Sequence, residues 1–362
     1  MTRLLINGAG GRIGRGVTRE VTNLMKDIAG TCKSNGPYLI ALNDLISIDD
    51  LINIYASRDP VHGIFDWKVE KVNDTLLTID GIPVNYTREK NPAEGLIKKA
   101  NIEMVLECSG FFGDPKVDKS VKLTPELNRA RGFIEAGAKR VVQTYPAKTA
   151  DISLIMGVNH GLYDPKKHRV VSNASCTTKA LSVPLQVLLD NGINIDSLSM
   201  DTTHAATATQ RVLESLSQIV THSTGAAKAT GLVIPSLSGK MSGMSYRVPT
   251  LDGSFANLYF VATADEELSA EKLNDLFRNA VANPKYAGRL GVFEGKDAGT
   301  FDIVGRRENA VVIPSKTSVL PLSFSPNGKK AYLVTVISGY DNELGSCVDP
   351  VILAKYITSR DN

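Results

Sequence analysis

The sequence predicts an α/β protein, with an N-terminal Rossmann-like doubly wound domain and a second, α+β domain whose sheet is mostly antiparallel. Three observations lead to this fold class. A strand, a glycine-rich turn and a helix open the chain, and short apolar runs alternate with helical segments up to about residue 170. Beyond that point the strand-like runs are longer and alternate between apolar and polar residues, as in a sheet with one solvated face. A length of 362 residues fits two domains.

The start of the chain has the strand–helix–strand order of a dinucleotide-binding unit. Residues 3–7 form an apolar run typical of a short buried strand, and a cluster of glycines follows at once. Apolar residues recur every three or four positions from Ile13 to Leu24, which predicts an amphipathic helix. A second buried strand at 38–42 leads directly to Asn43 and Asp44. This order predicts a βαβ unit with an acidic residue at the end of its second strand.

The remaining elements divide the chain into two domains. In the first part we expect strands at 75–79, 83–88, 103–109, 139–145 and 152–158, and a helix at 125–138. The second part begins with a helix at 176–189 and continues with strands at 195–207, 244–250, 254–264, 309–320 and 330–340 and helices at 225–240 and 269–283. We therefore predict one domain of residues 1–174, on which a C-terminal helix of residues 343–362 packs back, and a second domain of residues 175–342.

Composition excludes several classes of protein. The 41 basic and 38 acidic residues leave a net charge of only +3, which argues against a dedicated nucleic-acid-binding protein. No apolar run approaches the roughly 18 residues of a membrane span, and none near the start resembles a signal peptide. We therefore expect a cytoplasmic protein that does not bind membranes. The four cysteines include no CxxC pair, so we expect neither a disulfide framework nor a metal site.

The glycine cluster has the composition of a phosphate-binding turn. Gly8, Gly11 and Gly14 fit a G-x-x-G-x-x-G pattern, which is one residue longer than the usual dinucleotide fingerprint. Glycines let the backbone approach a pyrophosphate, to which the start of the following helix offers free N–H groups. A glycine turn without a ligand is the alternative, and the flanking strand and helix favour a cofactor. A carboxylate at Asp44 would bind the adenosine ribose and repel the extra phosphate of NADP, so we expect NAD.

Cys176 is a candidate reactive thiol. It lies where a strand ends and a helix begins, and the positive end of a helix dipole lowers the pKa of a thiol. Its neighbours are polar, whereas the other three cysteines fit the interpretation of small core residues. A thiolate also needs a base, and spacing alone does not choose among the five histidines, which are His62, His160, His168, His204 and His222.

Taken together, these segments resemble the phosphorylating glyceraldehyde-3-phosphate dehydrogenases. The most specific matches are SNASCTT at 172–178, STGAAK at 223–228, RVPT at 247–250 and YDNE at 340–343. Further matches stand in the family's order along nearly the whole chain: GRIGR at 11–15, ECSG at 107–110, GVNH at 157–160 and TTHAATATQ at 202–210.

The resemblance implies NAD-dependent oxidation of glyceraldehyde 3-phosphate, with inorganic phosphate as second substrate, 1,3-bisphosphoglycerate as product and a homotetrameric assembly. Cys176 matches the family nucleophile, which forms a thiohemiacetal and then a thioester, and His204 matches the base. The positions that match the cofactor site are Gly8, Gly11, Arg12, Ile13, Gly14, Asp44, Ser109 and Asn342. Thr207 and Arg247 match the substrate-phosphate site, and Ser175, Thr177, Thr224 and Gly225 match the site of the attacking phosphate.

Departures from the family pattern keep two other functions open. Lys179 stands where the family normally has asparagine, and the loop at 211–222 is shorter than usual and reads as a short helix rather than a basic segment. One alternative is a paralogue that acts on another phosphorylated aldose, such as erythrose 4-phosphate, with water replacing phosphate as the acceptor. The other is a non-catalytic binding or regulatory protein on the same scaffold, against which the retained Cys176 and His204 argue.

Overall fold

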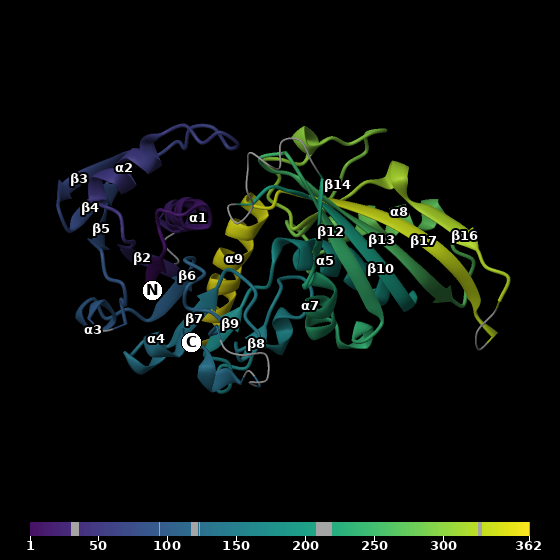
Figure 1. Cartoon of the computed structure of the whole chain (residues 1–362), viewed down its shortest axis with the longest axis horizontal. Coiled ribbons are helices and arrows are strands. Elements are labelled where there is room, and N and C mark those ends of the chain that lie inside the picture. Colours follow the sequence, from purple (N-terminus) through teal and green to yellow (C-terminus); the bar gives the residue numbers. More distant parts are fainter. Residues whose placement is uncertain are drawn as a thin grey trace. The chain divides into compact units, whose positions relative to one another are not determined.

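The computed structural model describes residues 1–29, 36–93, 95–116, 122, 124–207, 219–324 and 328–361. The chain divides into two compact units (Figure 1), which are unit 1 (Met1–Leu154, His160–Ala174 and Cys347–Asn362) and unit 2 (Ile155–Asn159 and Ser175–Ser346). Most of the loop predicted at 211–222 lies outside the described residues. Among the helices that are described, none has the length and apolar character needed to cross a membrane.

Unit 1 contains a nine-stranded sheet with the order β3-β4-β5-β2-β1-β6-β7-β9-β8. The strands from β5 to β8 in this order run parallel, and β3, β4 and β5 pair antiparallel at one edge. Leu4, Leu5 and Ile6 in the central strand are fully buried, as expected for a parallel sheet covered on both faces. This arrangement confirms the predicted Rossmann-like fold. Its elements are β1 (Thr2–Asn7), α1 (Arg12–Ala29), β2 (Pro37–Asn43), α2 (Ile48–Ala56), β3 (Val69–Asn73), β4 (Leu76–Ile79), β5 (Ile82–Thr87), α3 (Leu96–Lys99), β6 (Met104–Glu107), α4 (Arg131–Glu135), β7 (Arg140–Gln143), β8 (Ile152–Ser153) and β9 (Val170–Ser172).

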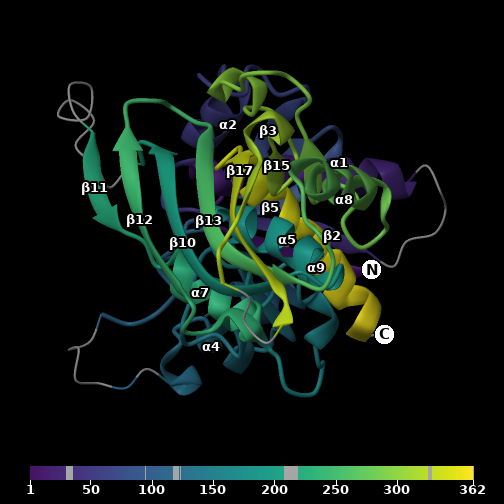
Figure 2. The same cartoon turned by 90° about the vertical axis from the view of Figure 1, so that its right-hand side faces the viewer.

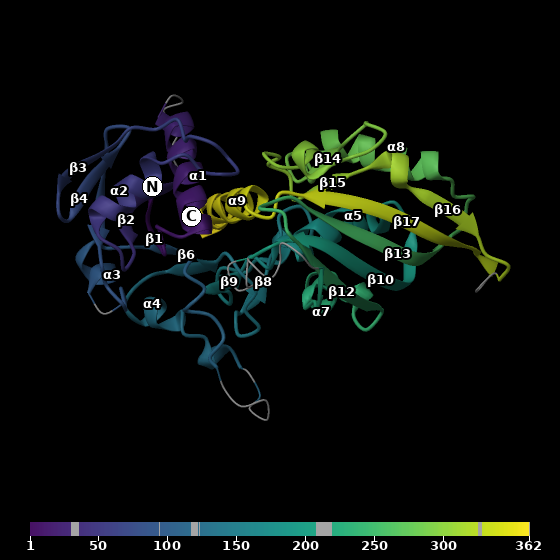
Figure 3. The same cartoon turned by 45° about the horizontal axis from the view of Figure 1, so that its top comes forward.

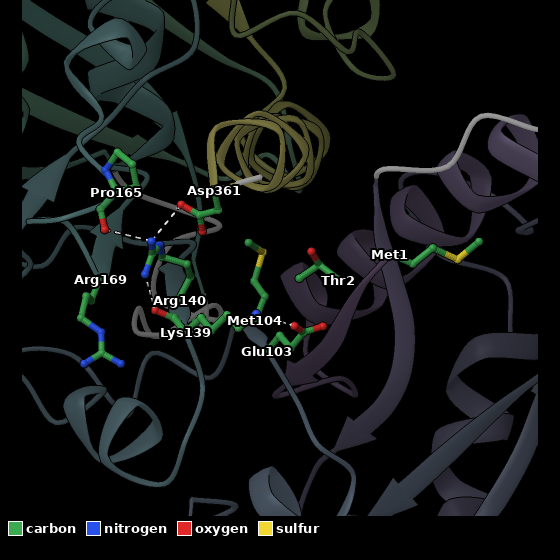
Figure 4. Close-up of a pocket in the computed structure, with 9 residues that line it drawn as sticks. All are labelled: Met1, Thr2, Glu103, Met104, Lys139, Arg140, Pro165, Arg169 and Asp361. Carbon is green, nitrogen blue, oxygen red and sulfur yellow. Dashed lines mark hydrogen bonds and ion pairs between the residues drawn. The ribbon is translucent and has the colours of Figure 1, made fainter.

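The last helix, α9 (Leu344–Asp361), lies beside α1 (Figure 3). Polar contacts near its start and at its end hold it to unit 1. Near its start, the buried amide of Asn173 donates to the carboxylate of Asp349 over 2.7 Å. At its end, the Arg140 guanidinium donates to Asp361 over 2.8 Å and to the carbonyl of Pro165 over 2.9 Å (Figure 4). These contacts fasten the helix to the sheet at both of its ends.

Unit 2 contains an eight-stranded, mostly antiparallel sheet with the order β11-β12-β10-β13-β17-β15-β14, to which β16 adds by pairing with β17 (Figure 2). Helix α5 is buried along almost its whole length and packs against β10, β13 and β17. The elements are α5 (Cys176–Asp190), β10 (Asn194–Ala205), β11 (Val220–Ser223), α7 (Ala226–Val233), β12 (Met241–Val248), β13 (Ser254–Ala264), α8 (Ala270–Ala282), β14 (Leu290–Val292), β15 (Ala310–Val312), β16 (Ser318–Pro321) and β17 (Lys330–Tyr340).

Two predicted elements are interrupted by residues that compete with regular hydrogen bonding. The helix expected at 125–138 is a 3₁₀ turn followed by the short α4, because the side chain of Asn128 accepts from the backbone N–H of Ala130 over 2.9 Å. The strand expected at 309–320 is split into β15 and β16 by a 3₁₀ turn that begins at Pro314, which has no N–H to donate.

Two other predicted elements end early. Only β8 forms within the strand expected at 152–158, since Asn159 accepts from the N–H of Ile155 over 2.9 Å and Gly157 adopts a φ of +84°. The helix expected at 225–240 stops with α7, and a 3₁₀ turn starts at Pro235.

Candidate active site

The glycine turn after β1 leaves no room for a side chain at Gly8 or Gly14. Gly8 has a φ of +82°, and a Cβ atom at Gly14 would overlap the carbonyl oxygen of Gly8. The backbone N–H of Gly10 donates to the Asp44 carboxylate over 2.8 Å, which ties the turn to the end of β2. Helix α1 then begins at Arg12, and its first N–H groups have no acceptor within the helix. The turn is therefore a cradle that fits a pyrophosphate.

A cavity of about 660 Å³ adjoins this turn. Its polar wall includes Asp44 and Ser109, and Ser109 follows β6 with its backbone packed against Gly8. The apolar wall is suited to a flat ring such as a nucleotide base. It contains Leu45, Ile46, Ile54, Phe111 and Phe112. Of the predicted cofactor residues of unit 1, those that line this cavity are Gly8, Gly11, Asp44 and Ser109, and those that open helix α1 directly after the turn are Arg12, Ile13 and Gly14.

Cys176 is the first residue of helix α5. Strand β9 ends at Ser172, and Ala174 adopts a φ of +56°, a conformation that is uncommon outside glycine. Ser175 caps the helix, since its hydroxyl accepts from the N–H of Thr178 over 3.1 Å. The thiol therefore lies at the positive end of α5, as the sequence predicts.

His204 lies beside Cys176 although 28 positions separate them along the chain. The Sγ of Cys176 is 3.5 Å from the Nε2 of His204, which is buried near the end of β10. The parallel register of β10 and β12 pairs His204 with Arg247. The Nη1 of Arg247 lies 2.5 Å from the Nδ1 of His204, and both nitrogens also contact the carbonyl of Ala205. Cysteine, histidine and arginine thus form one continuous polar cluster.

Burial favours the neutral forms of both reactive groups. Burial raises the pKa of the Cys176 thiol above its usual value, and the charge of Lys179, the Thr177 hydroxyl and N–H and the charge of Arg247 oppose this effect. Burial, together with the Arg247 charge, lowers the pKa of His204 to about 4. The lowered thiol pKa expected from the helix dipole is therefore wrong for this site, because burial of the thiolate outweighs the neighbouring groups that favour it.

Sequence reasoning missed a buried hydroxyl network behind the thiol. The Tyr340 hydroxyl lies 2.9 Å from the hydroxyl of Thr177 and 2.9 Å from that of Thr202. Its ring lies edge-on to His204, with centroids 5.9 Å apart. The sequence contained a signal for this residue, because Tyr340 is both the last residue of an apolar strand and the first residue of the YDNE motif.

The other predicted residues of unit 2 lie at element ends. Asn342 follows β17, and its side-chain oxygen accepts from the Ser254 hydroxyl over 3.0 Å. Thr207 follows β10 and is half-buried. Thr224 and Gly225 immediately precede α7, and the Thr224 hydroxyl accepts from the N–H of Ala226 over 3.2 Å. No hydrogen bond between described residues joins Thr224 or Gly225 directly to Cys176.

Comparison with known proteins agrees with this geometry. Residues 2–115 match a family model for the NAD binding domain of glyceraldehyde 3-phosphate dehydrogenase, and residues 175–342 match the model for its C-terminal domain. The chain is 33% identical over 366 aligned positions to glyceraldehyde-3-phosphate dehydrogenase of Priestia megaterium and 34% identical to glyceraldehyde-3-phosphate dehydrogenase 1 of Bacillus subtilis, with 98% of each chain covered. It is 35% identical to that of Kitasatospora aureofaciens, with 95% of this chain and 96% of the relative covered. The chain belongs to the glyceraldehyde-3-phosphate dehydrogenase family.

Proposed function

We propose that this chain is an NAD-dependent phosphorylating dehydrogenase of glyceraldehyde 3-phosphate, in which Cys176 is the nucleophile and His204 the base. The observation that carries the proposal is the 3.5 Å separation between the Cys176 Sγ and the His204 Nε2. That distance allows proton transfer between the two side chains once a substrate tightens the site. A thiol and an imidazole in this arrangement form the nucleophile–base pair of covalent catalysis on a carbonyl.

The oxidation step uses the pair twice. His204 first accepts the thiol proton, and the Cys176 thiolate attacks the aldehyde carbon to give a thiohemiacetal. The Cys176 N–H at the start of α5 would donate to the oxyanion that forms. The imidazolium of His204 then returns its proton to this oxyanion, and the neutral imidazole takes the proton back from the thiohemiacetal hydroxyl as the hydride leaves the same carbon, which gives a thioester. Because its pKa is about 4, His204 is neutral near pH 7 and can act as a base.

The second step transfers the acyl group to phosphate. An oxygen of inorganic phosphate attacks the thioester carbon and displaces the Cys176 thiolate, which yields an acyl phosphate. The thiolate then takes the proton that His204 holds, which regenerates the enzyme. We assign the attacking phosphate to Ser175, Thr177, Thr224 and Gly225. Hydroxyl and N–H donors at the starts of α5 and α7 support this assignment.

We assign the substrate phosphate to Arg247 and Thr207. A guanidinium can hold two phosphate oxygens at once, and Arg247 already contacts the proposed base. A phosphate bound there would fix the aldehyde end of the substrate near Cys176. The Arg247 Nη1 contacts the Nδ1 of His204 and the carbonyl of Ala205, so a phosphate held by this nitrogen would replace those partners.

The cofactor site is assigned to the cradle of unit 1. Gly8, Gly11, Arg12, Ile13 and Gly14 would hold the pyrophosphate, and NAD when bound supplies the acceptor for the hydride. Asp44 would accept hydrogen bonds from the adenosine ribose, and its charge would exclude a 2′-phosphate. We also propose that Ser109 lines the cofactor site and that the side-chain amide of Asn342 orients the nicotinamide.

The experiment that tests the reaction is NADH formation with glyceraldehyde 3-phosphate and with erythrose 4-phosphate, each with and without inorganic phosphate. We expect turnover with glyceraldehyde 3-phosphate that requires phosphate and yields 1,3-bisphosphoglycerate. Turnover that prefers erythrose 4-phosphate, or that proceeds equally well without phosphate, would replace the proposal with the paralogue reaction. Absence of turnover with either aldehyde would favour a binding protein.

The residue roles are tested with two substitutions. Cys176→Ala is expected to abolish turnover while NAD affinity stays unchanged, and His204→Asn is expected to slow the chemical step by roughly 10²–10⁴. The matched control is His222→Asn, which alters an exposed histidine of β11 and should keep full activity. Full activity of His204→Asn would remove histidine from the mechanism.

We also propose that the chain assembles into homotetramers through the sheet of unit 2. The face of this sheet opposite to α5 exposes apolar side chains that include Met244, Tyr259 and Leu333, each at least 40% exposed. Apolar side chains gathered on one sheet face favour burial against another copy. Light scattering after size-exclusion chromatography tests the mass, and a monomer at micromolar concentration would overturn this part of the proposal.

A further inference from the structure

Lys179 is buried one helical turn after the proposed nucleophile. It occupies the position three residues beyond Cys176 in α5, so both side chains lie on the same side of the helix. Only 1% of Lys179 is exposed to solvent, and its ammonium nitrogen is itself buried. Lysine is among the residues least often found in this environment, because an ammonium group loses its hydration there.

A buried cation and an anion formed beside it stabilise each other. Forming the Cys176 thiolate removes a proton from a thiol that has little contact with water, and burial therefore opposes it. The positive charge of Lys179 acts in the opposite direction and is the largest of the causes that lower the pKa of this thiol. The groups around the thiol are Lys179 on α5, His204 on β10, Arg247 on β12 and Tyr340 on β17.

The two cations of the cluster both favour the Cys176 thiolate, but only Arg247 also acts on His204. Burial is the largest cause that lowers the pKa of His204. Arg247, which contacts the imidazole directly, lowers it further, so its charge opposes protonation of the base. The charge of Lys179 acts on the thiol, from the helix that carries the thiol. Lys179 therefore favours the charged nucleophile without needing to touch the substrate.

We propose that Lys179 is a positioning residue that stabilises the thiolate of Cys176 through its buried positive charge. This inference rests on the proposed function of Cys176 as the nucleophile. The family pattern has asparagine, an uncharged amide, at the position of Lys179. The proposed role requires a positive charge, so a neutral side chain of similar length cannot fill it. Arginine keeps the charge and is expected to preserve the effect, whereas methionine keeps the length and loses it.

The test is the rate of Cys176 alkylation by iodoacetamide as a function of pH, followed by mass spectrometry on the full chain. Wild type, Lys179→Met and Lys179→Arg are compared, with Lys272→Met as a control at a lysine whose side chain is 41% exposed. We expect Lys179→Met to move the midpoint upward by about one pH unit, which makes alkylation near neutral pH about tenfold slower. The limiting rate at alkaline pH should match wild type, since access to the thiol is unchanged.

Two outcomes overturn the inference while leaving the proposed nucleophile intact. One is a Lys179→Met midpoint equal to that of wild type, and the other is a Lys179→Arg variant as slow as Lys179→Met. If Lys179→Met does not fold, Lys179→Gln serves as the neutral variant and has the same expected result. A wild-type Cys176 that reacts no faster than the other cysteines would instead overturn the proposed nucleophile, so the two failures are distinguishable.

Discussion

The guanidinium of Arg247 lies against the imidazole of His204, with 2.5 Å between Nη1 and Nδ1. Two neighbouring parallel strands place these side chains in register. The contact couples a group suited to bind phosphate with a group suited to accept a proton. A phosphate that draws the guanidinium away would raise the basicity of the imidazole only when substrate is present.

Replacing Arg247 with leucine should therefore change two quantities. The KM for the phosphorylated aldehyde should rise more than the KM for NAD, because the proposed bidentate contact to the substrate phosphate is lost. The acid limb of the pH profile of kcat/KM should move to higher pH, since removing the Arg247 charge raises the pKa of His204 from about 4. Steady-state kinetics across pH measure both effects. An unchanged aldehyde KM would move the substrate-phosphate site elsewhere.

Gly14→Ala is expected to destabilise unit 1 although alanine is the better helix former. Gly14 lies inside α1, where alanine would be favoured by about 0.5–1 kcal/mol on helix propensity alone. The added Cβ would overlap the carbonyl oxygen of Gly8, and overpacking of this kind typically costs about 1–3 kcal/mol. Urea unfolding should show the net loss, and NAD affinity should fall with it.

Gly11→Ala is the matched control in the same turn. A Cβ at Gly11 would lie 3.5 Å from the same carbonyl oxygen, which is an ordinary van der Waals distance. Its free energy of unfolding should stay within about 0.5 kcal/mol of wild type. Equal losses for the two variants would contradict the steric explanation.

Local patterns in the sequence predicted the local parts of this site. The strand, glycine turn and helix at the start of the chain could be predicted, because the spacing of apolar residues and the glycines of a turn are properties of neighbouring residues. Cys176 was placed at a helix start for the same reason, and Ser175 caps that helix. The family motif, and not spacing, selected His204 from five histidines.

The long-range relationships could not be derived from periodicity. The contact between His204 and Arg247 depends on β10 and β12 pairing in parallel, which no local pattern specifies. The raised pKa of the Cys176 thiol depends on burial by strands distant in sequence, so the helix-dipole argument alone gave the wrong direction. The break at Asn128 depends on a single side-chain hydrogen bond.

Tyr340→Phe is expected to lower stability through the hydroxyl network. The substitution removes hydrogen bonds of 2.9 Å to Thr177 and Thr202 in a fully buried environment. Two buried hydroxyls would each lose a partner, so we expect a loss of about 1–3 kcal/mol in the free energy of unfolding. Tyr259→Phe, at a tyrosine that is 40% exposed, should cost far less. Equal effects of the two substitutions would show that the network contributes little.

Glu107 should make the stability of the protein depend on pH. This carboxylate is fully buried at the end of β6 and accepts from the Asn7 amide over 2.5 Å and from the Ser109 N–H over 2.7 Å. Burial raises its pKa from 4.5 to about 7. Between these two values the folded state binds a proton that the unfolded state has released. The stability that this proton contributes is fully present below pH 4.5 and is lost as the pH rises through about 7.

The test compares the free energy of unfolding in urea of wild type with that of Glu107→Gln at about pH 5 and about pH 8. Glutamine cannot ionise, so wild type should lose up to about 3 kcal/mol relative to the variant as the pH rises. Glu103→Gln is the control: although burial raises the pKa of Glu103, Lys139 and Arg3 lower it below its usual value, so this carboxylate is ionised in the folded state at both pH values. Its difference from wild type should stay nearly constant. A constant difference for Glu107→Gln as well would mean that the Asn7 amide and the N–H and hydroxyl of Ser109, which all donate to this carboxylate, keep Glu107 ionised despite its burial.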